Sequence, residues 1–271
     1  MSGPAAALAD LEPDGVIAPM ARTAVLLDRV SLRHRGDAGP PGVLHDVSLT
    51  VGQGEFVCVV GASGCGKSTL LSLIAGLTTP TTGTVDVPAG RAALMFQEPA
   101  LFPWLTAGEN VEFALRLRGI GRRERRDRAG DLLDRVHLRG HHGTRVHELS
   151  GGMRQRVALA RALAQQSRLL LMDEPFAALD AITRDVLHEE LTAVWQDTGM
   201  TVVFVTHNVR EAVRLGQRVA LMSSRPGRFV RTWDVDIASP RRIESPEVAT
   251  LALEITDSLR REIRRHAGSA P

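Results

Sequence analysis

A glycine-rich stretch at residues 61–69 contains the residue types that bind phosphate. It matches the pattern G-x-x-x-x-G-K-[ST], and it lies between an apolar run that predicts a strand and a run that predicts a helix. Glycines let backbone N–H groups point at phosphate oxygens, and the start of the helix adds positive potential. The sequence therefore predicts a nucleotide-phosphate site formed by Gly61, Ala62, Ser63, Gly64, Cys65, Gly66, Lys67, Ser68 and Thr69.

The lysine of this stretch stands out in the composition. Lys67 is the only lysine among 33 basic residues, and the others are arginines. A compact ammonium group on a flexible stem can reach into a tight phosphate site, and the hydroxyl of Ser68 is a suitable Mg²⁺ ligand. The alternative, a glycine-rich turn without a ligand, does not explain why lysine is kept at this one position.

Two acidic residues end the apolar run at residues 169–172. A carboxylate at the C-terminal end of a sheet strand can hold Mg²⁺ through water, and the next carboxylate can orient the water that attacks a terminal phosphate. Asp173 suits the first role and Glu174 the second. Alone, this run would be a buried strand that meets solvent. Together with the phosphate loop, it predicts a reaction centre.

Two further polar residues follow predicted strands. His207 comes after the apolar run 201–206 and could contact the terminal phosphate. Gln97 comes after the run 94–96 and could bind Mg²⁺ or the attacking water. Taken singly, His207 would be a packing or surface residue and Gln97 a surface amide. Asn208 and Glu211 have the spacing to cap a following helix.

The period of the apolar residues alternates between strand and helix along the chain. Val47, Leu49 and Val51 repeat every second residue, as in a half-buried strand. Continuous apolar runs predict strands of a parallel sheet at residues 55–60, 91–96, 169–172 and 201–206. Helical periods occur at 67–75, at 110–118 behind a Thr106–Glu109 capping box, from 150 onward and at 183–197. These predict an α/β fold with a mostly parallel core sheet and a helical insertion.

The composition excludes several classes of protein. With 271 residues, of which 44% are hydrophobic and 24% charged, the chain is typical of a soluble globular protein. Its apolar runs are far shorter than the ~20 residues of a bilayer span, so we expect no transmembrane segment in it. The net charge of +2 gives no indication of a nucleic-acid partner. Two cysteines and no secretory signal predict a reducing cytosol.

Several short motifs occur together in a fixed order. They are the phosphate loop at 61–69, Gln97, Leu-Ser-Gly-Gly-Met at 149–153, the strand and acids at 169–174, Ala-Leu-Asp at 178–180, and His207. In this order and spacing, the chain resembles the ATP-binding subunit of an ABC transporter over about residues 24–229. The motif at 149–153, called the signature here, separates this family from other phosphate-loop proteins.

The resemblance implies a domain organisation, cofactors and an assembly. It implies a P-loop ABC ATPase domain at 23–235, with an N-terminal antiparallel β subdomain and an inserted helical subdomain at about 98–165, and with ATP and Mg²⁺ as cofactors. It also implies a head-to-tail dimer in which Ser150, Gly151 and Gly152 of one subunit bind the ATP held by the other. These residues begin a predicted helix, so their N–H groups suit an anion.

The resemblance also assigns individual roles. It implies Glu174, His207 and Gln97 for catalysis, Ser68, Gln97 and Asp173 for Mg²⁺, and Asp180 for nucleotide binding. Tyr is absent from the chain, and His34 stands where the family stacks an aromatic residue on adenine. Three other departures are Met153 for Gln, Ala177 for Ser and Asn208 for Asp.

Shorter motifs narrow the resemblance within the family. The stretches 102–106, 153–156, 180–184, 225–228 and 239–241 resemble the importers of nitrate, aliphatic sulfonates and taurine. This implies an ATPase on the cytoplasmic face of the membrane that energises uptake of a small anion. Its partners would be a second copy, a membrane-spanning permease and, indirectly, a periplasmic or extracellular solute-binding protein, with no nucleic acid. The alternative is a soluble ABC-type ATPase acting on DNA or ribosomes, whose two-cassette chains, coiled-coil insertions or zinc cysteines are missing here.

The remaining segments have simpler interpretations. Residues 1–22 show no period and predict a disordered leader, in which Met20 could be the true start. Residues 236–271 predict a tail with an amphipathic helix that starts at Ser245 and Pro246. The arginine-rich run 116–128 predicts a solvated helix face, with attraction to lipid headgroups as the alternative. His141, His142 and His147 predict a loop rather than a metal site.

Overall fold

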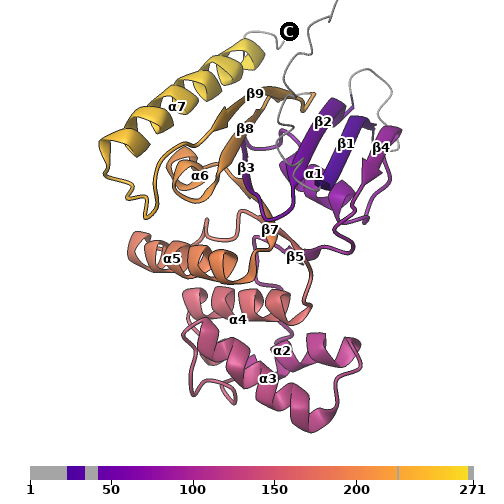
Figure 1. Ribbon diagram of the computed structural model, residues 1–271, viewed down its shortest axis with the longest axis vertical. Helices are drawn as coiled ribbons and strands as arrows, with labels where there is room; N and C mark the ends of the chain where they lie inside the picture. The colour runs from indigo at the N-terminus through magenta and orange to yellow at the C-terminus, as the bar shows by residue number, and fades with distance from the viewer. Residues whose placement is uncertain (1–22, 34–41, 225, 268–271) are drawn as a thin grey trace, which may run out of the picture.

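Two β-sheets and a layer of helices form the computed structural model, which describes residues 23–33, 42–224 and 226–267. The sheets occupy the upper half of Figure 1, and helices α2 (Ala107–Leu117), α3 (Arg122–Arg135) and α4 (Gly151–Ala164) form a separate layer below. Helix α5 (Ala181–Thr198) lies between the two parts. The predicted leader at 1–22 lies outside the described residues.

The larger sheet has six strands in the order β5-β6-β7-β3-β8-β9. The strands are β5 (Ala93–Met95), β6 (Leu169–Asp173), β7 (Thr201–Thr206), β3 (Phe56–Gly61), β8 (Arg218–Met222) and β9 (Phe229–Asp234). All neighbours are parallel except β8 and β9. The predicted parallel core sheet is therefore confirmed. The final antiparallel pair, β8 and β9, was not expected from the apolar runs.

The smaller sheet is antiparallel, with the order β2-β1-β4. Its strands are β1 (Thr23–Leu32), β2 (Leu44–Gly52) and β4 (Thr82–Asp86). In β2, Val47, Leu49 and Val51 are buried and the residues between them are exposed, as their two-residue period predicts. This buried face packs with β3 and helix α1 (Lys67–Ile74) in one core cluster. The smaller sheet thus holds the start of α1 against the central strand.

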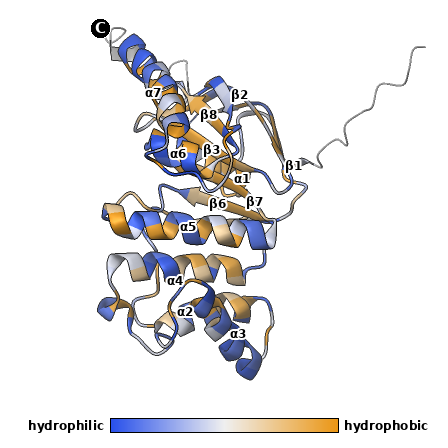
Figure 2. Cartoon of the chain, turned by 60° about the vertical axis from the view of Figure 1, so that its left-hand side comes forward, coloured by the Kyte–Doolittle hydropathy of each residue, from blue (hydrophilic) through white to orange (hydrophobic). Residues whose placement is uncertain are grey.

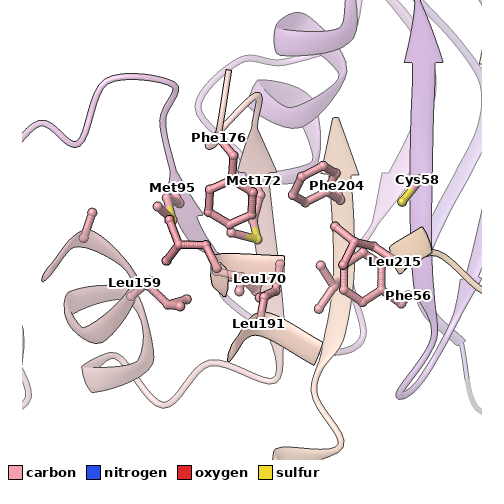
Figure 3. Close-up of a cluster of buried hydrophobic side chains, with 14 of the residues drawn as sticks. Phe56, Cys58, Met95, Leu159, Leu170, Met172, Phe176, Leu191, Phe204 and Leu215 are labelled. Atoms are coloured by element: carbon pink, nitrogen blue, oxygen red, sulfur yellow. The ribbon is translucent and has the colours of Figure 1, made fainter. Parts of the chain in front are cut away.

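The centre of the larger core consists of aromatic and aliphatic side chains between the sheet and helices α4 and α5 (Figure 3). The ring of Phe204 lies 6.1 Å from that of Phe56 and 5.9 Å from that of Phe176, measured between centroids. In Figure 2, the buried strands β3, β6 and β7 are hydrophobic, whereas helix α3 is largely hydrophilic. Strands buried on both faces need such continuous apolar sequences.

Side-chain caps fix where the helices begin. The Thr106 side chain accepts a hydrogen bond from the Glu109 N–H at 3.2 Å, and the Glu109 carboxylate accepts one from the Thr106 N–H at 2.8 Å. This capping box starts α2 at Ala107, so the predicted start at residue 110 was wrong by three positions. Asp180 likewise caps α5, which begins at Ala181 instead of the predicted residue 183. The N-cap lies immediately before the first helical residue.

The last two helices lie on the half of the larger sheet that contains β3, β8 and β9. Helix α6 (Val209–Leu215) follows β7, and α7 (Pro246–Ala267) packs on α6. The Trp233 indole N–H in β9 donates to the Glu254 carboxylate in α7 at 3.0 Å. The short 3-10 helix Val146–Glu148 leads into the signature. Within the described residues, none of the helices has the length and apolarity to cross a membrane.

Candidate functional site

The phosphate loop connects the central strand β3 to helix α1. Gly64 and Gly66 have positive φ angles of 75° and 104°, a region open to glycine and costly for most other residues. A Cβ atom on Gly66 would come within 2.6 Å of Leu44 Cδ2, so β2 also excludes a side chain there. The loop therefore has glycines where the backbone must turn toward the N-terminus of α1.

Lys67 is the buried cation of this loop. Its side chain is 5% exposed, and its Nζ donates hydrogen bonds of 3.1 Å to the carbonyl oxygens of Gly61 and Ala62. Nζ also lies 3.5 Å from Glu174 Oε1, the C-terminal neighbour of β6. The ammonium group is thus held over the loop by protein oxygens, which phosphate oxygens can replace because both accept hydrogen bonds.

Asp173 and Ser68 bring two hard oxygen donors together. Asp173 is the last residue of β6, and its carboxylate is hydrogen-bonded by the Ser68 hydroxyl. Burial raises the pKa of Asp173, and the charge of Glu174 raises it further, while the Ser68 hydrogen bond and Lys67 oppose the shift. Carboxylate and hydroxyl oxygens are ligands that Mg²⁺ accepts, so this donor set fits that cation.

Glu174 and His207 meet because β6 and β7 are parallel neighbours. Asp173 pairs with Val205, so the residues that follow each strand emerge at the same edge. Glu174 Oε2 lies 2.7 Å from His207 Nδ1, and the Glu174 N–H donates to the Val205 carbonyl oxygen at 2.9 Å. Glu174 has a φ of 44°, a costly conformation often found at functional sites. His207 remains 59% exposed and can meet a ligand.

Gln97 lies just beyond β5, next to β6 in the sheet. Its side chain is exposed, and its carbonyl oxygen accepts a hydrogen bond of 3.0 Å from Gln155 Nε2 in α4. This bond ties the loop after β5 to the signature helix. The structure therefore places Gln97 at the same edge as Asp173 and Glu174.

The signature residues begin helix α4 in the helical layer. Ser150 is the N-cap and accepts a hydrogen bond from the Met153 N–H at 3.2 Å, and both Ser150 and Gly151 are exposed. Gly152 is buried against α5, and a Cβ atom there would lie only 2.6 Å from Thr183 Cγ2. The phosphate loop, by contrast, lies at the sheet edge on the other side of α5 (Figures 1 and 2). One chain does not bring the two together.

The remaining predicted residues divide into described and undescribed ones. Asp180 is exposed, and hydrogen bonds from the backbone and hydroxyl of Thr183 lower its pKa. Asn208 caps α6 by accepting from the N–H groups of Arg210 and Glu211, as its position predicts. His34, the residue expected to stack on adenine, lies outside the described residues.

Two contacts of this site were not found from the sequence. One is the ion pair between Lys67 and Glu174, whose partners are far apart along the chain. The other is a buried contact between Glu211, which the sequence places in a helix cap, and His188. His188 is followed by two glutamates and lacks the second histidine of a zinc helix, so its motif gave no signal for this partner.

A glycine loop between a central parallel strand and a helix, with acids at the end of the neighbouring strand, defines a P-loop nucleotide hydrolase. The family model for ABC transporters matches residues 44–177. The chain is 45% identical to the taurine import ATP-binding protein TauB of Burkholderia pseudomallei, over 86% of this chain and 96% of that relative. The chain therefore belongs to the ATP-binding subunits of ABC transporters, and it is an ATPase.

Other relatives agree with this family. The nitrate import ATP-binding protein NrtD of Synechocystis is 45% identical over 84% of this chain and 86% of its own length. A dimeric structure of the ATP-binding cassette MJ0796, in a post-hydrolysis state with ADP and Pi, superposes with a TM-score of 0.71. It is 33% identical and covers 79% of this chain and all of that one. These relatives give no support to the DNA or ribosome alternative.

Proposed function

We propose that this chain is the ATPase subunit of an importer for a small anion such as taurine, a sulfonate or nitrate. The support for the solute class is the identity of 45% to both a taurine and a nitrate import subunit. It works on the cytoplasmic face of the membrane as a peripheral subunit. A membrane-spanning permease and, through it, a solute-binding protein outside the cytoplasm complete the importer.

The observation that carries the assembly is the separation of the phosphate loop from the signature. The exposed N–H groups at the start of α4 suit an anion, yet the phosphate loop of the same chain lies beyond α5. A second copy in head-to-tail orientation supplies that anion as bound ATP. The dimeric structure of the MJ0796 cassette supports assembly as a pair of subunits.

The residue roles in this proposal follow from the chemistry of each group. Lys67 binds the outer phosphates, and Ser68, Asp173 and Gln97 would hold Mg²⁺, which would supply positive charge to offset that of the phosphates. Glu174 orients the attacking water and accepts its proton. His207 holds Glu174 through Nδ1 and presents its exposed ring to the terminal phosphate.

The substitution Glu174→Gln tests this assignment. The amide keeps the shape of the side chain but cannot accept a proton, so hydrolysis should fall by at least about 100-fold. ATP should still bind, and the variant should accumulate as a dimer in size-exclusion chromatography with ATP. Glu124→Gln, an exposed glutamate on α3, is the matched control and should behave as the unmodified chain.

Normal hydrolysis by Glu174→Gln would remove Glu174 from the catalytic role. Failure of that variant to dimerise with ATP would contradict the head-to-tail assembly. The solute class is tested on the chain purified with its permease and solute-binding protein: taurine or nitrate should stimulate ATP hydrolysis, whereas a cationic solute should not.

A further inference from the structure

A buried polar network lies directly behind the loop that carries His207. Its members are His188 in α5, Glu211 in α6 and Thr206 at the end of β7. All three are nearly inaccessible, with exposed fractions of 1%, 4% and 2%. His188 Nε2 lies 2.6 Å from Glu211 Oε1, and the Thr206 hydroxyl hydrogen-bonds Glu211 Oε2. Buried polar groups of this kind depend on one another because water cannot replace a lost partner.

The direction of each hydrogen bond in this network can be assigned. Arg214 Nη1 lies 3.5 Å from His188 Nδ1, and a guanidinium group can only donate. At the other side of the ring, Glu211 Oε1 belongs to a carboxylate, which only accepts, so His188 donates to it through Nε2–H. The Arg214 guanidinium is itself fixed by Asp185 at 2.6 Å and Glu189 at 3.3 Å. The network thus starts from an anchored cation and ends on the Glu211 carboxylate.

Glu211 forms hydrogen bonds with Thr206 and Asn208, the two residues beside His207. The Thr206 hydroxyl donates its proton to Glu211, so its oxygen can accept a hydrogen bond of 3.0 Å from the Asn208 N–H. The Glu211 N–H in turn donates to the Asn208 side chain at 3.3 Å. Thr206 and Asn208 are the chain neighbours of His207. Both flanks of His207 are therefore tied to Glu211, Thr206 through its carboxylate and Asn208 through its backbone N–H.

We propose that His188 is a positioning residue for hydrolysis, acting through Glu211 and Thr206 to hold His207 against Glu174. His188 never touches the substrate. It orients the Glu211 carboxylate, which orients the Thr206 hydroxyl, which fixes the loop that presents His207 at 2.7 Å from Glu174. The inference rests on the proposed catalytic roles of His207 and Glu174. It adds a second layer of residues that those roles require.

Thr206→Val tests the network with a change that preserves side-chain shape. Losing the hydroxyl frees the Asn208 N–H and one Glu211 oxygen, so kcat for ATP should fall about tenfold or more while KM stays within about twofold. Thr201→Val is the matched control. Thr201 is equally buried and hydrogen-bonded at the opposite end of the same strand, so kcat should stay within about twofold.

Substitutions of His188 separate positioning from simple stability. His188→Leu should lower kcat like Thr206→Val, whereas His188→Gln should restore most of it, because an amide keeps one donor and one acceptor. His188→Leu combined with His207→Ala should be no slower than His207→Ala alone. Residues that act through one group give such non-additive losses.

Three results would overturn the proposal: an unchanged kcat for Thr206→Val, a loss in His188→Leu that His188→Gln does not restore, or additive losses in the double variant. The outcome is distinct from that of the proposed function. If Glu174→Gln abolishes hydrolysis and Thr206→Val does not slow it, the positioning role alone is wrong. If Glu174→Gln hydrolyses ATP normally, the underlying catalytic assignment is wrong.

Discussion

A buried ion pair joins the signature helix to its neighbour. Arg156 Nη2 in α4 lies 3.0 Å from Glu190 Oε1 in α5, and the Glu190 side chain is 4% exposed. The next nitrogen is Nε2 of His137, at 3.9 Å. No donor among the described residues has good hydrogen-bond geometry to either Glu190 oxygen, so charge attraction is their main compensation. Burial raises the pKa of Glu190, while Arg156 and His137 oppose the rise.

Removing the cation of this pair should be costly. Arg156→Met leaves a buried carboxylate without its main partner, and we expect the free energy of unfolding to fall by about 3 kcal/mol. Urea unfolding followed by circular dichroism measures this loss. Arg139→Met is the control, because Arg139 forms an exposed pair with Asp134 and should cost less than about 1 kcal/mol. A similar loss in both variants would contradict the buried role of Arg156.

The cost of Arg156→Met should also depend on pH. The pKa of Glu190 is higher in the folded chain than in the unfolded one, so the folded state binds its proton more readily. Folding is therefore penalised once the pH rises above the unfolded pKa, and protonation relieves the penalty below it. The difference between Arg156→Met and the unmodified chain should be smaller at pH 5 than at pH 7.5. A difference that grows toward acid would contradict this cause.

At the scale of elements, helices α4 and α5 approach closely at a single glycine. Only hydrogen fits at Gly152, because Thr183 Cγ2 occupies the space where a Cβ atom would lie. The Thr183 hydroxyl is hydrogen-bonded to Asp180, which keeps this methyl group directed at α4. The spacing of the signature helix from α5 is therefore set by one hydrogen atom and one methyl group.

A pair of substitutions tests this contact. Gly152→Ala should overpack the interface and lower the free energy of unfolding by about 1–3 kcal/mol, although alanine favours a helix. Adding Thr183→Ser removes the offending methyl and keeps the hydroxyl, so it should restore most of the loss. Thermal unfolding of the two variants and of Thr183→Ser alone makes the comparison. Equal stability of the single and double variants would show that the contact is relieved elsewhere.

The elements that the sequence predicts well are those with local signals. The continuous apolar runs locate β3, β6 and β7. The Thr106 capping box and the helical period at 183–197 locate the starts of α2 and α5 to within three residues. Strands β8 and β9 carry weaker signals. Phe229–Asp234 alternates poorly and is mostly exposed, so its strand form depends on pairing with β8 rather than on its own composition.

The candidate site also contains residues that the sequence predicts and contacts that it does not. Lys67, Asp173, Glu174 and His207 follow from motifs at strand ends, because parallel strands bring their carboxyl ends to one edge. The contacts of His188 and of Glu190 do not follow from any motif. They join helices whose relative rotation is decided by packing, so a one-dimensional pattern does not contain them.

At the scale of the molecule, the helical layer is joined to the larger sheet through the loop after β5. Gln155 donates to the Gln97 carbonyl oxygen at 3.0 Å, and Arg161 donates to those of Pro99 and Ala100 at 2.8 Å and 2.7 Å. These bonds run from one helix, α4, to three carbonyl groups within residues 97–100. A rotation of that helix would therefore pull on the strand end where Gln97 lies.

Because the chain has a single lysine, cleavage after Lys67 can be used to detect opening of the phosphate loop. An endoprotease specific for lysine has one peptide bond to cut, after the buried Lys67, and would release fragments 1–67 and 68–271. The folded chain should resist it, and ATP should slow cleavage further because it binds the folded state alone. Gel electrophoresis of timed digests makes the comparison, with an arginine-specific protease as control. Rapid cleavage of the native chain would mean that this loop opens on its own, so one bond distinguishes local opening from global loss of structure.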